Sequence, residues 1–137
     1  MQLQPYLFFE GRCEEAIEFY RRTLGAEVVM LMRYKDNPQP QPGMIKPGTE
    51  NQVMHAHLNI GGQSLLLSDG QCSGQPNFSG FQLSLTVPSE DAAKKLFAAL
   101  SEGGQVRMPL AKTFWTSSFG MLVDKFGVGW MVSVEHK

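Results

Sequence analysis

The chain has 137 residues, of which 42% are hydrophobic and 18% charged, and its formal net charge is −1. This length and composition are typical of a single folded domain and argue against global disorder. The near-neutral charge, without a basic stripe, gives no support for binding to nucleic acid or to an anionic membrane. No apolar run has the length of a transmembrane helix, and the N-terminus has no secretory signal pattern, so we expect a cytoplasmic protein.

The first half of the chain begins with a strand and a helix. Residues 3–9 alternate with a period of two, so Tyr6 and Phe8 are predicted to share one strand face, opposite Leu7 and Phe9. A helix is predicted over 12–24, because apolar residues recur at helical spacing, acidic residues lie near its start and Gly25 follows its end. Cys13 at its start and Cys72 have no metal-ligand spacing, which predicts two reduced thiols.

Three more strands complete this half. They are predicted over 26–34, 53–60 and 63–68, and Gly61-Gly62 joins the last two as a hairpin. The intervening stretch 36–49 contains four prolines and is predicted to be a loop.

After a polar stretch at 69–80, which predicts a linker, the pattern starts again. A strand is predicted over 81–87, and Ser89 begins a helix that stops at Gly103-Gly104. Val106 opens a connecting stretch that runs through Trp115, and a hairpin then follows with strands at 119–124 and 128–134. Asp124 is predicted to brace the turn of this hairpin.

The two halves align at an offset of 78 residues. This offset matches Gln4 with Gln82, Phe19 with Phe97 and Gly25 with Gly103. Each half therefore reads as strand, helix and three strands, with one module at about 1–70 and the other at about 81–137. Since one βαβββ module cannot cover both faces of its sheet, two are expected to pair around a cleft within a single α+β domain. Coincidental α+β periodicity is the alternative.

Three sequence motifs carry a resemblance to a known family. They are Ala16 to Gly25 (AIEFYRRTLG), Phe114-Trp115, and Phe119-Gly120 with Asp124-Lys125-Phe126-Gly127 and Trp130-Met131. With the repeat, these motifs resemble the vicinal oxygen chelate superfamily of glyoxalase I, bleomycin-resistance proteins and extradiol dioxygenases, in particular its PhnB-like branch. The resemblance implies two βαβββ modules in a curved mixed sheet around a cleft, and a homodimer. Some relatives are labelled demethylubiquinone methyltransferases, but no glycine-rich loop follows a strand here to seat S-adenosylmethionine.

The resemblance also implies a divalent metal, held by one ligand from the first strand and one from the last strand of each module. Carried over to this chain, the early positions fall on Gln4 (Pro5 if the register slips by one) and Gln82. The late positions fall on 66–68 and Met131. Because none of them is a carboxylate and neutral amides bind hard dications poorly, we expect this metal site to be lost and no cofactor to be bound.

His55 and His57 offer a second possibility, because residues two apart on a strand project from the same face. Such a pair is half of a zinc, nickel or iron site, and Gln82, Glu10 or Glu50 could supply a third ligand for a metal-dependent isomerase, lyase or dioxygenase. Without a metal, either histidine is a candidate general acid or base. Both could also be polar residues that simply hydrogen-bond on a partly solvated face.

Aromatic and polar side chains at alternate strand positions and in the last loop are expected to line a cleft. We therefore predict a protein that binds a small, partly apolar ligand between its modules. The alternatives are the metal-dependent enzyme and a non-catalytic homodimer that presents a surface to another protein. The predicted ligand-binding residues are Gln4, Tyr6, Gln82, Ser84, Phe114, Trp115, Ser117 and Trp130.

Overall fold

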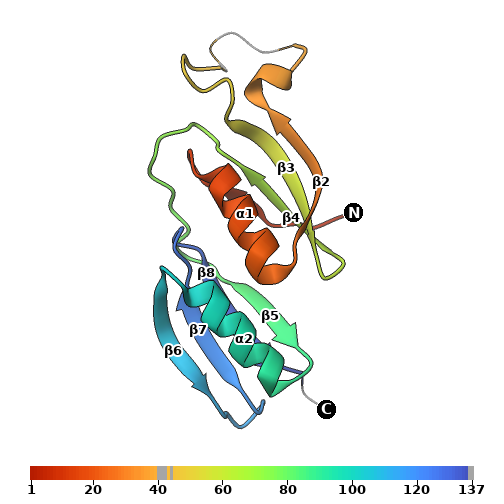
Figure 1. Ribbon diagram of the computed structural model, residues 1–137, viewed down its shortest axis with the longest axis vertical. Helices are drawn as coiled ribbons and strands as arrows, with labels where there is room; N and C mark the ends of the chain where they lie inside the picture. The colour runs from red at the N-terminus through yellow and green to blue at the C-terminus, as the bar shows by residue number, and fades with distance from the viewer. Residues whose placement is uncertain (40–42, 44, 136–137) are drawn as a thin grey trace. The chain divides into compact units, whose positions relative to one another are not determined.

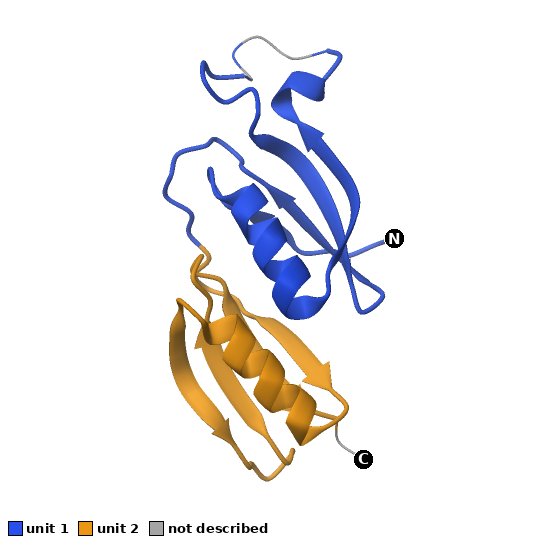
Figure 2. Ribbon diagram, in the orientation of Figure 1, with its two compact units in different colours: residues 1–77 blue, residues 78–137 orange. Residues whose placement is uncertain are grey.

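The computed structural model describes residues 1–39, 43 and 45–135 (Figure 1). The chain divides into two compact units, residues 1–77 and 78–137, and each of them contains one four-stranded sheet and one α-helix (Figure 2). The predicted α+β class and the two βαβββ modules are therefore confirmed. Neither α-helix of the described chain is long and apolar enough to span a membrane.

Unit 1 has the strand order β1-β4-β3-β2, in which β1 is parallel to β4 and the other neighbours are antiparallel. The hairpin of β3 and β4 has the predicted bounds, because Gly61-Gly62 supplies the two positive-φ residues of its turn. The elements are β1 (Tyr6–Phe8), α1 (Cys13–Leu24), β2 (Glu27–Arg33), the 3₁₀ helix η1 (Tyr34–Asp36), β3 (Val53–Ile60) and β4 (Gln63–Ser68).

Helix α1 packs on one face of the sheet of unit 1 (Figure 1). Acidic residues in its first turn favour the helix dipole, and Gly25 ends it in the left-handed conformation. Its apolar stripe buries against every second residue of the strands, including Leu7, Leu58 and Leu67. The alternate residues, Tyr6 and Phe8 among them, lie on the opposite face of the sheet, which α1 leaves uncovered.

Unit 2 repeats this arrangement with the strand order β5-β8-β7-β6. Ser89 caps its helix by accepting a hydrogen bond from the Ala92 N–H at 3.1 Å. Asp124 braces the β7–β8 turn as predicted, since its Oδ1 accepts the N–H groups of Phe126 and Val128 at 2.9 and 3.0 Å. The elements are β5 (Leu83–Val87), α2 (Glu90–Ser101), β6 (Gln105–Ala111), β7 (Phe119–Val123) and β8 (Gly129–Val134).

Two strands differ from their predicted bounds. Strand β1 is shorter than the predicted 3–9, and Leu3, at 98% exposure, lies outside the core. Strand β6 extends to Ala111, where a connecting stretch was predicted from Val106 onward. The strand tolerates Pro109, which lacks an N–H, because β6 is an edge strand with a register shift between Met108 and Ala111.

The predicted loop at 36–49 begins inside η1, and Pro40, Pro42 and Met44 lie outside the described residues. The boundary between the units falls within the predicted linker, after Asn77. The single-domain assignment, the cleft between the modules and the homodimer stay predictions.

Candidate ligand-binding site

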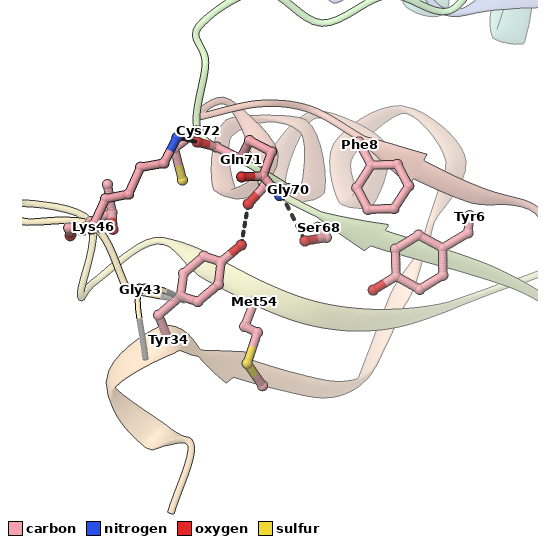
Figure 3. Close-up of a pocket in the computed structure, with 11 residues that line it drawn as sticks. Tyr6, Phe8, Tyr34, Gly43, Lys46, Met54, Ser68, Gly70, Gln71 and Cys72 are labelled. Carbon is pink, nitrogen blue, oxygen red and sulfur yellow. Dashed lines mark hydrogen bonds between the residues drawn. The ribbon is translucent and has the colours of Figure 1, made fainter. Parts of the chain in front are cut away.

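A pocket of about 430 Å³ opens on unit 1, where β1 and the end of β4 meet η1 and the segment that precedes β3 (Figure 3). It therefore draws on stretches that are far apart in the sequence. Its lining residues are Tyr6, Phe8, Tyr34, Gly43, Lys46, Thr49, Met54, Ser68, Gly70, Gln71 and Cys72.

One wall of the pocket is aromatic. Tyr6 and Phe8 project from the uncovered sheet face, and their rings stack with centroids 5.0 Å apart. They remain 38% and 50% exposed although both are large and apolar. Two adjacent aromatic rings in this position form a flat surface on which a ring-containing ligand can stack. Met54 lines the pocket as well and adds a polarizable, adaptable side chain.

The other end of the pocket is lined by hydroxyl groups. Ser68 lies between the phenol groups of Tyr6 and Tyr34 (Figure 3), and its hydroxyl accepts the Gly70 N–H at 2.9 Å. The Tyr34 hydroxyl donates to the Gly70 carbonyl. Burial raises the pKa of both phenols, and hydrogen bonding to Ser68 offsets part of this effect. Both phenols therefore stay protonated at neutral pH and can donate hydrogen bonds.

His55 and His57 face the same side of the sheet but have different partners. The Tyr6 hydroxyl lies 2.8 Å from His55 Nδ1, whereas His57 Nε2 lies 2.8 Å from the Ser64 hydroxyl. Among residues 1–39, 43 and 45–135, no three His, Cys, Asp or Glu side chains form a group that could hold a metal ion. Gln82, one of the three candidate third ligands, belongs to unit 2.

A buried carboxylate, which no pattern in the sequence indicated, connects the elements around the pocket. Asp69, placed within the predicted linker, is fully buried directly after β4. Its Oδ1 accepts the N–H groups of Gly11 and Cys13 at 2.9 and 2.8 Å, and its Oδ2 accepts that of Val53 at 2.7 Å. One side chain thereby fixes the end of β4 to the starts of α1 and β3.

Glu10 holds the turn that follows Asp69. Its carboxylate accepts the Gln71 N–H at 3.1 Å and the Ser73 hydroxyl at 2.8 Å. Glu10 and Cys72 both adopt positive φ, at 52° and 55°, which costs a non-glycine residue of order 1 kcal/mol or more. Glycine suits position 70, because its φ is 58° and because a Cβ there would lie 2.0 Å from Glu10 Oε2 and displace this carboxylate from its hydrogen bonds.

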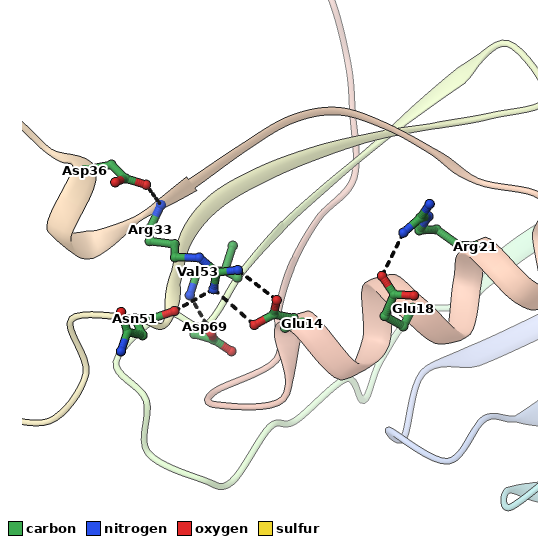
Figure 4. A network of polar contacts seen from close by, with 8 residues as sticks. All are labelled: Glu14, Glu18, Arg21, Arg33, Asp36, Asn51, Val53 and Asp69. Atoms are coloured by element: carbon green, nitrogen blue, oxygen red, sulfur yellow. Dashed lines mark hydrogen bonds and ion pairs between the residues drawn. The ribbon is translucent and has the colours of Figure 1, made fainter.

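Arg33 fastens the segment between β2 and β3 at both of its ends (Figure 4). Its guanidinium binds both carboxylate oxygens of Glu14, at 2.8 and 3.0 Å, and donates to the Asn51 carbonyl at 2.7 Å. Its backbone N–H donates to Asp36 at 2.9 Å. The hydrogen bonds from Arg33 lower the pKa of Glu14. The segment that carries part of the pocket lining is thus anchored to α1.

Of the eight predicted ligand-binding residues, Tyr6 lines this pocket. Gln4 is half-buried just before β1. The other six lie in unit 2, and Trp130 is 2% exposed there with its Nε1 donating to Asp124 at 2.8 Å, which does not favour ligand contact. Phe114 and Trp115 are exposed in a turn held by Thr113 and Thr116. The remaining three, all exposed, are Gln82, Ser84 and Ser117.

The period-two pattern of β1 was a signal for Phe8, which follows Tyr6 on the same face. The other missed lining residues lie in turns or on irregular strand ends, where the sequence has no periodicity.

Comparison with known proteins identifies close relatives of this chain. Protein YjdN of Escherichia coli (strain K12) is 37% identical over 142 residues, which cover 98% of this chain and 95% of YjdN. The crystal structure of protein PA1353 from Pseudomonas aeruginosa is 40% identical, with a TM-score of 0.85 and coverage of 100% and 99% of the two chains. A Bacillus cereus structure described as a putative 3-demethylubiquinone-9 3-methyltransferase, PhnB protein, is 29% identical, with a TM-score of 0.81 and coverage of 98% and 100%.

More distant structures share the fold. A glyoxylase/bleomycin resistance protein/dioxygenase domain from Frankia sp. EAN1pec has a TM-score of 0.65 at 13% identity, covering 98% of this chain and 89% of its own. The model of the family described as 3-demethylubiquinone-9 3-methyltransferase matches residues 1–133. The chain belongs to this family, the PhnB-like branch of the vicinal oxygen chelate superfamily.

Proposed function

We propose that this protein binds a small, partly apolar ligand in the pocket of unit 1 and does so without a metal ion. The observation that carries the proposal is the stacked pair of Tyr6 and Phe8 beside the hydroxyl groups of Ser68 and Tyr34, in a pocket of about 430 Å³. Small-molecule pockets are typically about 300–1,000 Å³ and combine an apolar lining with a few polar groups that orient the ligand. A role in binding explains why these aromatic rings are exposed.

The donor groups at the superfamily's metal positions do not fit a hard divalent cation. Strand pairing aligns Tyr6 with Leu66 in unit 1 and Ser84 with Met131 in unit 2, so Leu66 and Met131 are equivalent late positions. Leucine has no donor atom and methionine offers a soft thioether, whereas cations such as Mg²⁺ and Mn²⁺ need charged oxygen ligands. We derive no chemistry from a metal at these positions.

The methyltransferase description of the family model finds no support in the strand–helix turns. The β1–α1 turn contains one glycine, Gly11, and the β5–α2 turn is Pro88-Ser89. Neither provides the run of glycines that lets a backbone approach a nucleoside cofactor closely.

Tyr6 connects the pocket to His55, which is hydrogen-bonded to a lining residue but is not itself part of the lining. The Tyr6 hydroxyl stays protonated because its pKa is raised, and it donates to His55 Nδ1 in the tautomer that leaves this nitrogen without a proton. A neutral imidazole that accepts at Nδ1 carries its proton on Nε2, so His55 can donate to an acceptor on a ligand. The same proton would serve in general acid catalysis, which is how the enzyme alternative would use this residue.

Calorimetric binding of small ring compounds, in buffer with EDTA, tests the proposal. Phe8→Ala removes half of the aromatic wall and is expected to weaken binding about fivefold to tenfold. Phe114→Ala is the matched control, because Phe114 is equally apolar and 96% exposed but belongs to unit 2. Weaker binding by Phe114→Ala, together with unchanged binding by Phe8→Ala, would place the site in unit 2 instead.

Metal analysis of protein purified without tag or chelator separates the enzyme alternative. We expect no stoichiometric metal. Nickel, zinc, iron, manganese or cobalt at one equivalent, lost in His55→Ala or His57→Ala, would overturn the proposal and favour the metal-dependent isomerase, lyase or dioxygenase. A protein that binds none of the ring compounds would favour the non-catalytic dimer.

A further inference from the structure

We infer that the ligand of the unit 1 pocket is a flat ring compound with a single carboxylate, and that Lys46 selects it by its charge. This inference rests on the proposed function, because it assumes that the pocket binds a ligand. It adds to the proposed function the charge of the ligand and the residue, Lys46, that recognises this charge.

Hydrogen bonds hold both the backbone carbonyl and the side-chain ammonium group of Lys46. Its carbonyl accepts the Thr49 N–H at 3.1 Å and the Thr49 hydroxyl at 2.6 Å, which closes a turn around Pro47-Gly48. Its Nζ donates to the Gln71 carbonyl at 3.0 Å, and both residues line the pocket. An ammonium group has three N–H donors, so this bond leaves two of them for a ligand.

Lys46 is the one formally charged side chain among the described residues that line the pocket. Three nearby carboxylates have hydrogen-bond partners, and one of them is Glu50, whose Oε1 accepts the Gly48 N–H at 3.2 Å within the Lys46 turn. Asp69 is fully buried and accepts three backbone N–H groups, and Glu10 accepts hydrogen bonds from Gln71 and Ser73. The charges of Asp69 and Glu10 reach Cys72 and Tyr34 of the lining, but none of these carboxylates lines the pocket, so the ammonium group is the charged group that an entering anion contacts directly.

The remaining polar groups also suit an acceptor. The Cys72 thiol is kept protonated, because burial and the neighbouring Asp69 and Glu10 raise its pKa, and it can therefore donate to a ligand. The pocket thus combines donors with an aromatic wall. A single ammonium group matches one carboxylate, whereas a doubly charged group would need a second cation or a cradle of backbone N–H groups.

A matched pair of probes, 2-naphthoate and 2-naphthamide, isolates the charge, because the two molecules share the ring and nearly the same shape. Lys46 is exposed, so its pairing with a carboxylate is expected to favour naphthoate over naphthamide about threefold to fivefold by calorimetry. Lys46→Met should abolish this preference, and Lys46→Arg should retain it. Lys35→Met is the control, since Lys35 is an exposed lysine of η1 outside the pocket lining.

Ionic strength provides a second readout. Raising the salt concentration should weaken naphthoate binding and leave naphthamide binding unchanged, because exposed ion pairs are screened. Equal affinity for the two probes, or a preference that survives in Lys46→Met, would overturn the inference while the proposed function stands. Binding of neither probe would overturn both.

Discussion

Among the carboxylates of unit 1, we expect Asp69 to contribute most to the free energy of unfolding. Replacing it with alanine would leave the N–H groups of Gly11, Cys13 and Val53 without their acceptor. Each buried donor that loses its partner costs about 1–3 kcal/mol, and two of these three bonds are fully buried. The expected loss in the free energy of unfolding is about 3–5 kcal/mol, a large part of the 5–15 kcal/mol typical of a domain.

Urea unfolding followed by far-ultraviolet circular dichroism measures this loss. Asp69→Asn should cost less, about 1–3 kcal/mol, because the amide keeps one oxygen but turns its NH₂ group toward a donor. It remains measurable if Asp69→Ala does not fold. Asp91→Ala is the control, since Asp91 is an exposed aspartate in the first turn of α2 and should cost about 0.5 kcal/mol. A loss below about 1 kcal/mol in Asp69→Ala would refute this reasoning.

Three further predictions concern other parts of the two units. Asp124→Ala removes the acceptor of two backbone N–H groups and of the Trp130 indole, so it should lower the free energy of unfolding by about 3 kcal/mol. It should also shift the fluorescence of Trp130, measured with the other tryptophan replaced by phenylalanine. An unchanged emission maximum would contradict this prediction. Arg33→Met should cost about 1 kcal/mol or less at pH 7, because the Glu14 pair is partly exposed. Since Arg33 lowers the pKa of Glu14, the contribution of this ion pair to stability is present above the unfolded Glu14 pKa of about 4.3 and is lost as the pH falls through the folded pKa. Equal costs of Arg33→Met at pH 7 and pH 3 in urea unfolding would argue against this contribution. Burial, and then the charges of neighbouring carboxylates, raise the pKa of Cys13. The contribution of its protonated thiol to the free energy of unfolding is therefore complete below the unfolded pKa of about 8.5 and falls above it by up to about 1.4 kcal/mol per pH unit. Cys13→Ala should flatten this decline, and an identical pH profile of stability would count against it.

The fold could be predicted because its signals are local. The apolar stripe of α1 and Gly25 define a helix within twelve residues, and Gly61-Gly62 fixes a hairpin turn directly. The extent of strand β6 was not predicted, because its residues are nearly all exposed and Pro109 interrupts the pattern, whereas its place at the sheet edge is a property of the assembled sheet.

The candidate site was harder to predict because its contacts join distant residues. Asp69 binds backbone groups that lie 16 to 58 residues away, and nothing in its own neighbourhood marks it as more than a turn residue. Lys46 lies in a proline-rich stretch without periodicity, and its position depends on a carbonyl 25 residues later. Trp130 was interpreted as a pocket residue because tryptophan suits both pocket and core, and the choice depends on Asp124 as its partner.

Whether the chain can bind the superfamily's metal depends on the residue types in the sequence and on their positions in the sheets. The sequence shows which residue types stand at the superfamily's ligand positions, and strand pairing then shows that Leu66 and Met131 occupy matching places in the two units. Residue type and position together place no charged oxygen ligand at these two matching positions, and the proposal of metal-free binding rests on this.

Carbon-13 methyl spectra of the methionines, recorded during a titration with 2-naphthoate in EDTA, test the central claim most directly. Met54 lines the pocket of unit 1, whereas Met121 and Met131 lie on the strands of unit 2 and serve as internal references. The account predicts a saturable shift of the Met54 methyl signal that is weaker in Phe8→Ala and needs no metal. A response confined to Met121 and Met131, or one that appears only after a divalent metal is added, would contradict it.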